Sequence, residues 1–279
     1  MKLGVCLFTL FALAVLGHVG YAMHFPGWRL HRHTSLRASA ADDDKLDPRF
    51  GPFYFDQPID HNAPDNGTFK HRYWANHDWY KPGGPVILYN AGETPADDRS
   101  KYVVNSTMAE LARALDGAVI VIEHRNYGKS QPGSDLSVDN LKHLTTSQAL
   151  EDMATFIRDA EIPDLGNLNP AEGTRWIVYG GSYSGNLAAW MRYRYPDLVF
   201  AAVPSSAPVE MRFNYYQYFE VIQKYAPSEC VSAIERVIRF VDLILFNPLL
   251  HEDKKELKKK FGVEELIHDD DFAERKYTS

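Results

Sequence analysis

Four short apolar runs alternate with segments of helical periodicity, and this alternation restricts the chain to few architectures. A run that is apolar without interruption is typical of a strand buried on both faces of a sheet. The runs occupy residues 86–89, 118–122, 176–179 and 200–203. The segments with helical spacing occupy residues 102–115, 147–160 and 183–195. This order predicts an α/β core, in which a mostly parallel sheet carries helices on both faces.

The segments before and after these alternating runs have a different character. Residues 69–74 alternate, are rich in aromatic side chains and follow a turn signal at residues 65–67, which predicts an antiparallel strand. Residues 215–246 have apolar positions at helical spacing and no strand pattern, and residues 254–260 form a charged helix face. We therefore expect the core over residues 49–209 and the start of a helical insertion, or cap, over residues 210–279.

The N-terminal segment has the features of a secretory signal peptide. Lys2 precedes an apolar run over residues 3–16, and the small residues Gly20 and Ala22 predict cleavage after Ala22. The run is shorter than the ~20 residues that a membrane span needs. Residues 23–48 are polar and lack periodicity, as in a pro-segment or linker. We expect a protein without a membrane span that is secreted or resides in a lysosomal or vacuolar lumen.

Composition excludes several classes of partner. The formal net charge is −7, so the basic surface that nucleic acids require is not expected. The histidines are scattered rather than set at ligand spacing, so we expect neither a metal nor an organic cofactor. Asn66 and Asn105 each begin an Asn-X-Thr sequon, and behind a signal peptide both are candidate glycosylation sites.

Cysteine usage is unusual for the predicted compartment. Cys6 leaves with the signal peptide, so Cys230 is the only cysteine of the mature chain. In an oxidising compartment, one cysteine suggests a disulfide partner outside this chain or in another molecule. A buried reduced thiol is the alternative.

A glycine-rich segment after the third apolar run predicts the catalytic centre. It reads Gly-Gly-Ser-Tyr-Ser-Gly over residues 180–185 and lies between a strand and a helix, the context of a nucleophile elbow. Ser182 is then the nucleophile, and Gly180, Gly181 and Gly185 supply the small neighbours. Ser184 stands where G-x-S-x-G has glycine. The alternatives are a turn with an incidental serine or a phosphate-binding loop, although the Lys of a Walker loop is missing.

Further candidates lie on two other loops. The backbone N–H of Tyr183 would stabilise an oxyanion, and the loop after the first apolar run offers Ala91 and Gly92 as second donors. His124 is not the expected base, because the base follows the nucleophile in the chain order of this fold. We expect Glu123, His124 and Arg125 to brace the active-site loops through hydrogen bonds and charge pairing.

Several stretches together resemble one peptidase family. Over residues 50 to 210 the sequence is similar to lysosomal Pro-Xaa carboxypeptidase, dipeptidyl peptidase II and thymus-specific serine protease. The elbow of that family usually reads Gly-Gly-Ser-Tyr-Gly-Gly, so Ser184 departs from it without affecting the nucleophile. The matching stretches are residues 55–61, 123–130, 148–150, 180–192, 195–197 and 205–208.

The resemblance implies an α/β-hydrolase core, interrupted by a helical insertion, that cleaves peptides beside proline. Such enzymes release either a C-terminal residue or an N-terminal dipeptide, and the sequence leaves this choice and the oligomeric state open. In the family the acid and base follow the insertion, whereas here only His251 and His268 follow Ser182, both in charged stretches. We therefore expect a truncated chain that lacks the triad Asp and His, lacks the disulfide partner of Cys230 and has little activity alone.

Two other functions are compatible with parts of this pattern. An esterase or lipase of the same fold would need a usable Asp and His after Ser182. A non-catalytic secreted binding module, or a remnant, would need no base, but an incomplete sheet would expose strand edges.

Overall fold

The computed structural model describes residues 46–213 and 215–272. The predicted signal peptide, and the predicted pro-segment up to residue 45, lie outside the described residues. The chain forms two compact units that divide between Met211 and Arg212, close to the predicted boundary at residue 209. The two units are described separately.

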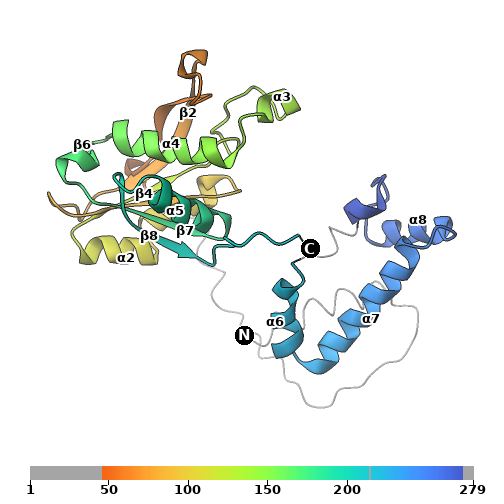
Figure 1. The fold of residues 1–279 in the computed structure, drawn as a ribbon. Coiled ribbons are helices and arrows are strands. Elements are labelled where there is room, and N and C mark those ends of the chain that lie inside the picture. Colours follow the sequence, from red (N-terminus) through yellow and green to blue (C-terminus); the bar gives the residue numbers. More distant parts are fainter. Residues whose placement is uncertain (1–45, 214, 273–279) are drawn as a thin grey trace. The chain divides into compact units, whose positions relative to one another are not determined.

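A six-stranded sheet forms the centre of the first unit (Figure 1). The strand order is β1-β2-β4-β3-β7-β8, and the neighbours among β4, β3, β7 and β8 are parallel. β1 and β2 form an antiparallel hairpin that joins the sheet through an antiparallel β2–β4 pair. The strands span Phe53–Pro58 (β1), Thr68–Asn76 (β2), Val86–Asn90 (β3), Ala118–Ile122 (β4), Trp176–Gly181 (β7) and Val199–Ser205 (β8).

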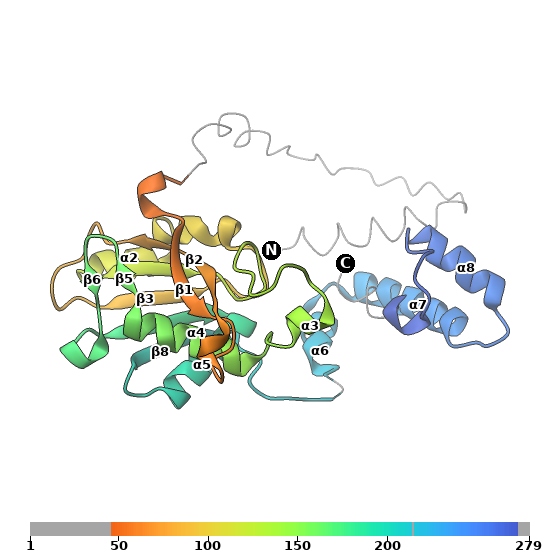
Figure 2. The same cartoon turned by 90° about the horizontal axis from the view of Figure 1, so that it is seen from above.

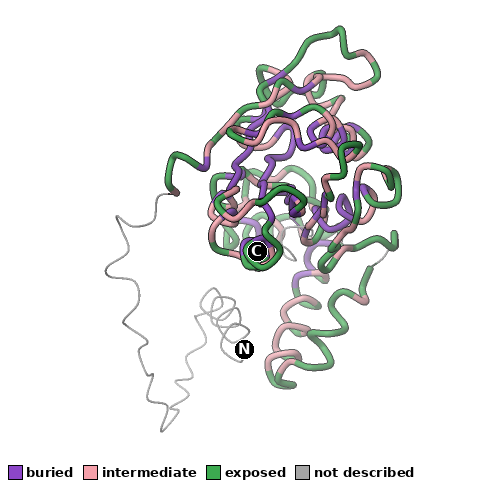
Figure 3. Tube along the Cα trace, turned by 90° about the vertical axis from the view of Figure 1, so that its left-hand side faces the viewer, coloured by how far each residue is buried: buried purple, intermediate pink, exposed green. Residues whose placement is uncertain are grey.

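The two faces of the sheet are covered by different helices, because successive strand residues point to opposite sides. Val86 and Leu88 pack into a cluster with α4 (Thr146–Asp159) and α5 (Tyr183–Arg194). Ile87 and Tyr89 pack into a second cluster with the 3-10 helix η3 (Ala96–Val103) and α2 (Thr107–Ala114). The same two layers are visible from above (Figure 2), and the strands of the unit contain many of its buried residues (Figure 3).

This arrangement confirms the α/β prediction, with two local differences. β1 was not predicted. Its first four residues alternate between half-buried and exposed, so its apolar signal in the sequence is weak. The predicted helix over residues 102–115 is wrong in its first part, since α2 begins only at Thr107. The Ser106 hydroxyl caps α2 by accepting a hydrogen bond from the Ala109 N–H at 3.1 Å.

The second unit is helical. It contains α6 (Gln217–Tyr225), α7 (Ser228–Leu245) and α8 (His251–Lys260), so the single helical stretch over residues 215–246 is two helices that meet at Pro227. Cys230 lies half-buried on α7. In residues 46–213 and 215–272, no helix is long and apolar enough to cross a membrane. The apolar cluster of this unit consists of Val241, Ile244, Leu245, Leu257 and Phe272.

Short elements complete the first unit. They are the 3-10 helices η1 (Pro48–Phe50), η2 (Pro64–Asn66) and η4 (Pro170–Glu172), the single turn α3 (Val138–Leu141), and the two-residue strands β5 (Glu161–Ile162) and β6 (Gly166–Asn167). Both sequon residues, Asn66 and Asn105, are exposed, as glycosylation requires.

Candidate active site

Ser182 lies at the sharp turn between β7 and α5. Its backbone has φ 57° and ψ −128°, a conformation that non-glycine residues rarely adopt and that costs of order 1–3 kcal/mol. The turn is held from both sides, because the Ser182 N–H donates to the Ser205 carbonyl of β8 at 3.0 Å and its carbonyl accepts from the Asn186 N–H at 3.1 Å. The side chain is exposed at the carboxyl end of the strand, where open α/β sheets bind ligands.

Two of the three predicted elbow glycines are required by close backbone contacts. A Cβ on Gly180 would lie 1.9 Å from the Ser184 carbonyl oxygen, and one on Gly185 would lie 2.8 Å from the Ser205 carbonyl oxygen. A Cβ on Gly181 would have nothing within 4 Å. The turn therefore depends on Gly180 and Gly185, whereas Gly181 has room for a side chain.

A cavity of about 470 Å³ opens beside Ser182. The loop after β3 forms one wall, with Ala91, Gly92 and Glu93. The end of β8 and the start of the loop that follows it form another wall. Arg99 of η3 contributes a cation to the lining. The elbow and the predicted oxyanion loop thus meet at one cavity.

The hydrogen bonds of this loop change the choice of oxyanion donor. The Ala91 N–H donates to the Ile122 carbonyl and the Gly92 N–H to the Asn90 side chain, each at 2.9 Å. Both predicted donors are therefore already engaged, and the prediction of Ala91 and Gly92 is corrected. Within the described ranges the N–H groups of Glu93 and Tyr183 have no hydrogen-bond partner, so these two amides can meet an oxyanion.

His124 contacts the elbow helix rather than Ser182. Its Nε2 lies 3.0 Å from the Tyr183 hydroxyl, and its Nδ1 lies 2.8 Å from the Arg125 carbonyl oxygen. Burial lowers the pKa of His124 and so favours the neutral ring, and the hydrogen bond to the Arg125 carbonyl partly offsets this shift. Among the residues with described positions, no histidine is hydrogen-bonded to the Ser182 hydroxyl.

Glu123 is the fully buried anchor of the loop that follows β4. Its Oε2 accepts from the N–H groups of Lys129 and Ser130 and from the Ser130 hydroxyl, at 2.7–3.0 Å. Its Oε1 accepts from the Ala96 N–H at 2.9 Å, and both oxygens pair with Arg72. Burial alone would raise the pKa of Glu123, but these hydrogen bonds outweigh it and lower the pKa. Glu123 therefore ties the loop to η3.

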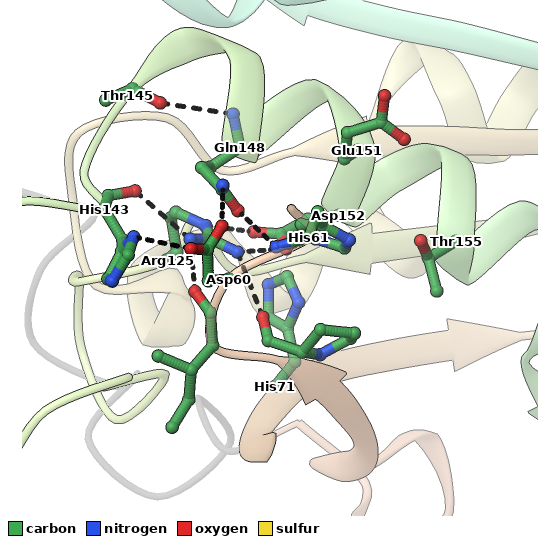
Figure 4. A network of polar contacts seen from close by, with 12 residues as sticks. Asp60, His61, His71, Arg125, His143, Thr145, Gln148, Glu151, Asp152 and Thr155 are labelled. Carbon is green, nitrogen blue, oxygen red and sulfur yellow. Dashed lines mark hydrogen bonds and ion pairs between the residues drawn. The ribbon is translucent and has the colours of Figure 1, made fainter. Parts of the chain in front are cut away.

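Arg125 fixes a second group of segments (Figure 4). Its Nε and Nη2 donate to the two carboxylate oxygens of Asp152 on α4, at 2.7 and 2.6 Å. Its Nη1 donates to the carbonyl oxygens of Ile59 and His143 at 3.1 Å. His61 Nε2 also lies 2.7 Å from Asp152. Burial would raise the pKa of Asp152, but the hydrogen bonds of Arg125 and His61 and the Arg125 charge keep it well below its usual range.

Sequence reasoning missed the partners of these side chains. Arg72 lies in a strand and Asp152 in a helix, and each is almost completely buried. A charged residue on a predicted core face was the available signal, since such residues are almost never buried unless paired. In the part of the chain that the structure describes, no group of three His, Cys, Asp or Glu side chains could hold a metal ion.

The mixed, mostly parallel sheet and the serine at its strand–helix turn define an α/β-hydrolase fold. The chain belongs to the family described as serine carboxypeptidase S28, whose model matches residues 57–277. That match includes the sheet from the end of β1 onward, the elbow and most of the helical unit.

Several characterised sequences are similar to this chain. One named "Probable extracellular serine carboxypeptidase", from Arthroderma benhamiae, is 38% identical over 251 residues, which are 87% of this chain and 34% of the relative. "Serine protease vicPb" of Bipolaris victoriae is 39% identical, over 76% of this chain and 40% of the relative. "Thymus-specific serine protease" of Mus musculus is 37% identical, over 69% and 38%. The chain thus spans 34% to 40% of the length of these relatives.

Among solved structures, a proline iminopeptidase from Mycobacterium smegmatis is 19% identical to this chain. The alignment covers 74% of this chain and 60% of that one, with a TM-score of 0.45.

Proposed function

We propose that this chain carries the nucleophile of a secreted or lumenal serine exopeptidase that cleaves peptides beside proline through an acyl-enzyme on Ser182. Family membership supports serine peptidase chemistry. Cleavage beside proline is the expectation from the resemblance to Pro-Xaa carboxypeptidase and dipeptidyl peptidase II. Secretion agrees with the signal-peptide pattern and with the extracellular relative.

The conformation of Ser182 is the observation that carries this proposal. A strained serine lies at a strand–helix turn, lines a cavity and is followed by the Tyr183 amide, which like the Glu93 amide has no hydrogen-bond partner among the described residues. Acyl transfer needs such an arrangement. Such strain persists only where the surrounding structure enforces it. Here neighbouring backbone atoms lie so close to Gly180 and Gly185 that a larger residue would not fit at either position.

The chemistry follows from this arrangement. Ser182 Oγ attacks the carbonyl carbon of the substrate while its proton passes to a general base. The N–H groups of Tyr183 and Glu93 donate to the oxyanion, which then collapses as the C–N bond breaks and the amine leaves with the proton. Water hydrolyses the resulting ester by the same route in reverse. The proposal assigns the base and its carboxylate to parts of the protein that the structure does not describe.

The test uses the intact protein that contains this chain. A fluorophosphonate should label Ser182 at a rate that exceeds that of a surface serine, and Ser182→Ala should abolish both the labelling and the hydrolysis of proline-containing peptides. Ser184→Ala serves as a matched control, because it removes the neighbouring serine of the elbow and should retain the labelling. Labelling of Ser184 instead, or hydrolysis that survives Ser182→Ala, would refute the proposal.

The same reagents test the expectation that this chain has little activity alone. Removing members of a triad costs several powers of ten in rate and leaves only residual catalysis. Purified residues 23–279 should therefore hydrolyse a proline-containing peptide at least about 1,000-fold more slowly than the intact protein. Equal rates would show that the base lies within this chain.

A further inference from the structure

Arg99 has an unusual environment for a partly buried cation. It lies on η3 and lines the cavity that contains Ser182. Its Nη1 donates to the Tyr102 hydroxyl at 3.1 Å and to the Tyr89 hydroxyl at 3.3 Å, and its guanidinium lies 5.6 Å from the centre of the Tyr102 ring. These neutral contacts fix one edge of the guanidinium and leave its charge uncompensated.

The other buried arginines of the core are all neutralised. Arg72 pairs with Glu123 and Asp97, and Arg125 pairs with Asp152. Across residues 46–213 and 215–272, no Asp or Glu forms an ion pair with Arg99. Since a partly desolvated cation gains free energy from an anionic partner, this position favours a ligand carboxylate.

The cavity around Arg99 has room for the end of a peptide. A sphere of its volume, about 470 Å³, is about 10 Å across, which is the length of about three extended residues at 3.3–3.6 Å each. A second cavity of about 210 Å³ adjoins it and shares Tyr89, Arg99 and Gly181. Tyr89 packs edge-on against Tyr102, with ring centres 5.5 Å apart, and Tyr179 completes an aromatic wall.

We propose that Arg99 binds the C-terminal carboxylate of the peptide substrate, with Tyr89, Tyr102 and Tyr179 beside the terminal side chain. This proposal rests on the proposed function, because it takes Ser182 as the nucleophile. It makes the enzyme a carboxypeptidase, since the terminal carboxylate then lies within about three residues of the scissile carbonyl. The guanidinium acts on binding and position, and Arg99 takes no part in bond cleavage.

Comparison of Arg99 with the acidic residue of the same cavity favours a carboxypeptidase over a dipeptidyl peptidase. Glu93 also lines the cavity and could pair with a substrate amine, but its side chain is exposed and no hydrogen bond from the described residues holds it. Arg99 is fixed before substrate binds, so less conformational entropy is lost on binding. Of the two charged side chains in the cavity, Arg99 is therefore the one that is preorganised for a ligand.

The direct test is a binding measurement on Ser182→Ala in the intact protein, which does not depend on turnover. Two fluorescent, N-acetylated proline-containing peptides are compared, one with a free C-terminal carboxylate and one with a C-terminal amide. We expect the free acid to bind about 10- to 100-fold more tightly, the usual value of a charge-assisted hydrogen-bonded pair. Adding Arg99→Met should reduce this ratio to near one, and Arg99→Lys should restore only part of it.

Arg113→Met is the matched control. Arg113 also stacks over an aromatic ring, that of Trp79 at 4.6 Å, but is exposed and does not line the cavity. It should leave the acid-to-amide ratio unchanged. Equal binding of the two peptides, or a ratio that Arg99→Met does not change, would overturn the assignment.

Kinetics of the active enzyme separate the two proposals. Arg99→Met should raise KM for the free acid while fluorophosphonate labelling of Ser182 stays unchanged. Failure of labelling with a preserved acid-to-amide binding ratio would refute the nucleophile but retain the carboxylate site. Preferred cleavage of a peptide with a free N-terminus and a C-terminal amide, abolished by Glu93→Gln, would overturn the carboxylate site but retain the nucleophile.

Discussion

Removing the charge of Asp152 should destabilise the core strongly while changing few atoms. In Asp152→Asn the Arg125 guanidinium loses the one carboxylate partner that it has among the described residues, and both side chains are almost completely buried, at 0% and 2% exposure. Removing one member of a buried ion pair costs about 3–5 kcal/mol, because the remaining charge is left uncompensated. With an m-value of about 2 kcal/mol/M, a loss of about 4 kcal/mol lowers the urea midpoint by about 2 M.

Tryptophan fluorescence during urea unfolding of the intact protein measures this change. Four of the five tryptophans of the chain lie in the core, so within the chain the signal reports mainly on this unit; they are Trp74, Trp79, Trp176 and Trp190. The matched control is Asp56→Asn, which removes an exposed ion pair with Lys70 and should change the free energy of unfolding by no more than about 1 kcal/mol. A loss below about 1 kcal/mol in Asp152→Asn would refute the assignment of Arg125 and Asp152 as the main brace of this region.

The pH dependence gives a second readout of the same pair. The folded pKa of Asp152 lies below its ordinary value of about 3.9, so the folded state binds this proton less readily than the unfolded state. The stabilisation is complete above about pH 4 and is lost as the pH falls through the folded pKa. The difference between wild type and Asp152→Asn should therefore be constant from pH 7 to about pH 5 and shrink below about pH 4.

Four further substitutions test the elbow and its surroundings. Gly180→Ala should abolish fluorophosphonate labelling, because the new Cβ would lie 1.9 Å from the Ser184 carbonyl oxygen, whereas Gly181→Ala, with nothing within 4 Å, should retain it. Ser184→Ala should cost about 1 kcal/mol of unfolding free energy, since it removes the 2.6 Å hydrogen bond from the Ser184 hydroxyl to the Asn90 carbonyl. Burial lowers the pKa of His124, so protonation of the unfolded state reduces the free energy of unfolding below about pH 6.5. In urea titrations, His124→Gln should reduce the pH dependence of this free energy by up to about 1.4 kcal/mol per pH unit. An unlabelled Gly181→Ala, or pH dependences that match in His124→Gln and wild type, would contradict these expectations.

The sheet could be predicted from the sequence because its central strands are buried on both faces. β3 and β4 are buried at every position, so their apolar runs are continuous and unambiguous. β1 escaped prediction because it is an edge strand whose residues alternate between half-buried and exposed. Helix boundaries were less predictable, since the start of α2 depends on a hydroxyl cap at Ser106 rather than on apolar spacing.

The elbow turn at Ser182 could be predicted from the sequence, but the cation of the cavity could not. Ser182 sits in a local pattern, because the turn needs small residues at fixed sequence distances. Arg99 is brought to the cavity by the fold, through a 3-10 helix that follows β3, and nothing in the neighbouring sequence marks it. The second oxyanion donor was misassigned for a related reason. The N–H groups of Ala91 and Gly92 are engaged because the fold brings the Ile122 carbonyl and the Asn90 side chain within hydrogen-bond distance.

The number of partners at Glu123 constrains how this protein can evolve. Replacement of Glu123 by an apolar residue leaves several loop donors without their acceptor and Arg72 with Asp97 alone, so a single substitution there is costly. Arg99 touches only tyrosine hydroxyls and a ring, and its replacement leaves no buried charge behind. If Arg99 binds the substrate carboxylate as proposed, substrate preference can change by single substitutions at Arg99, while the contacts of Glu123 keep the loop after β4 fixed.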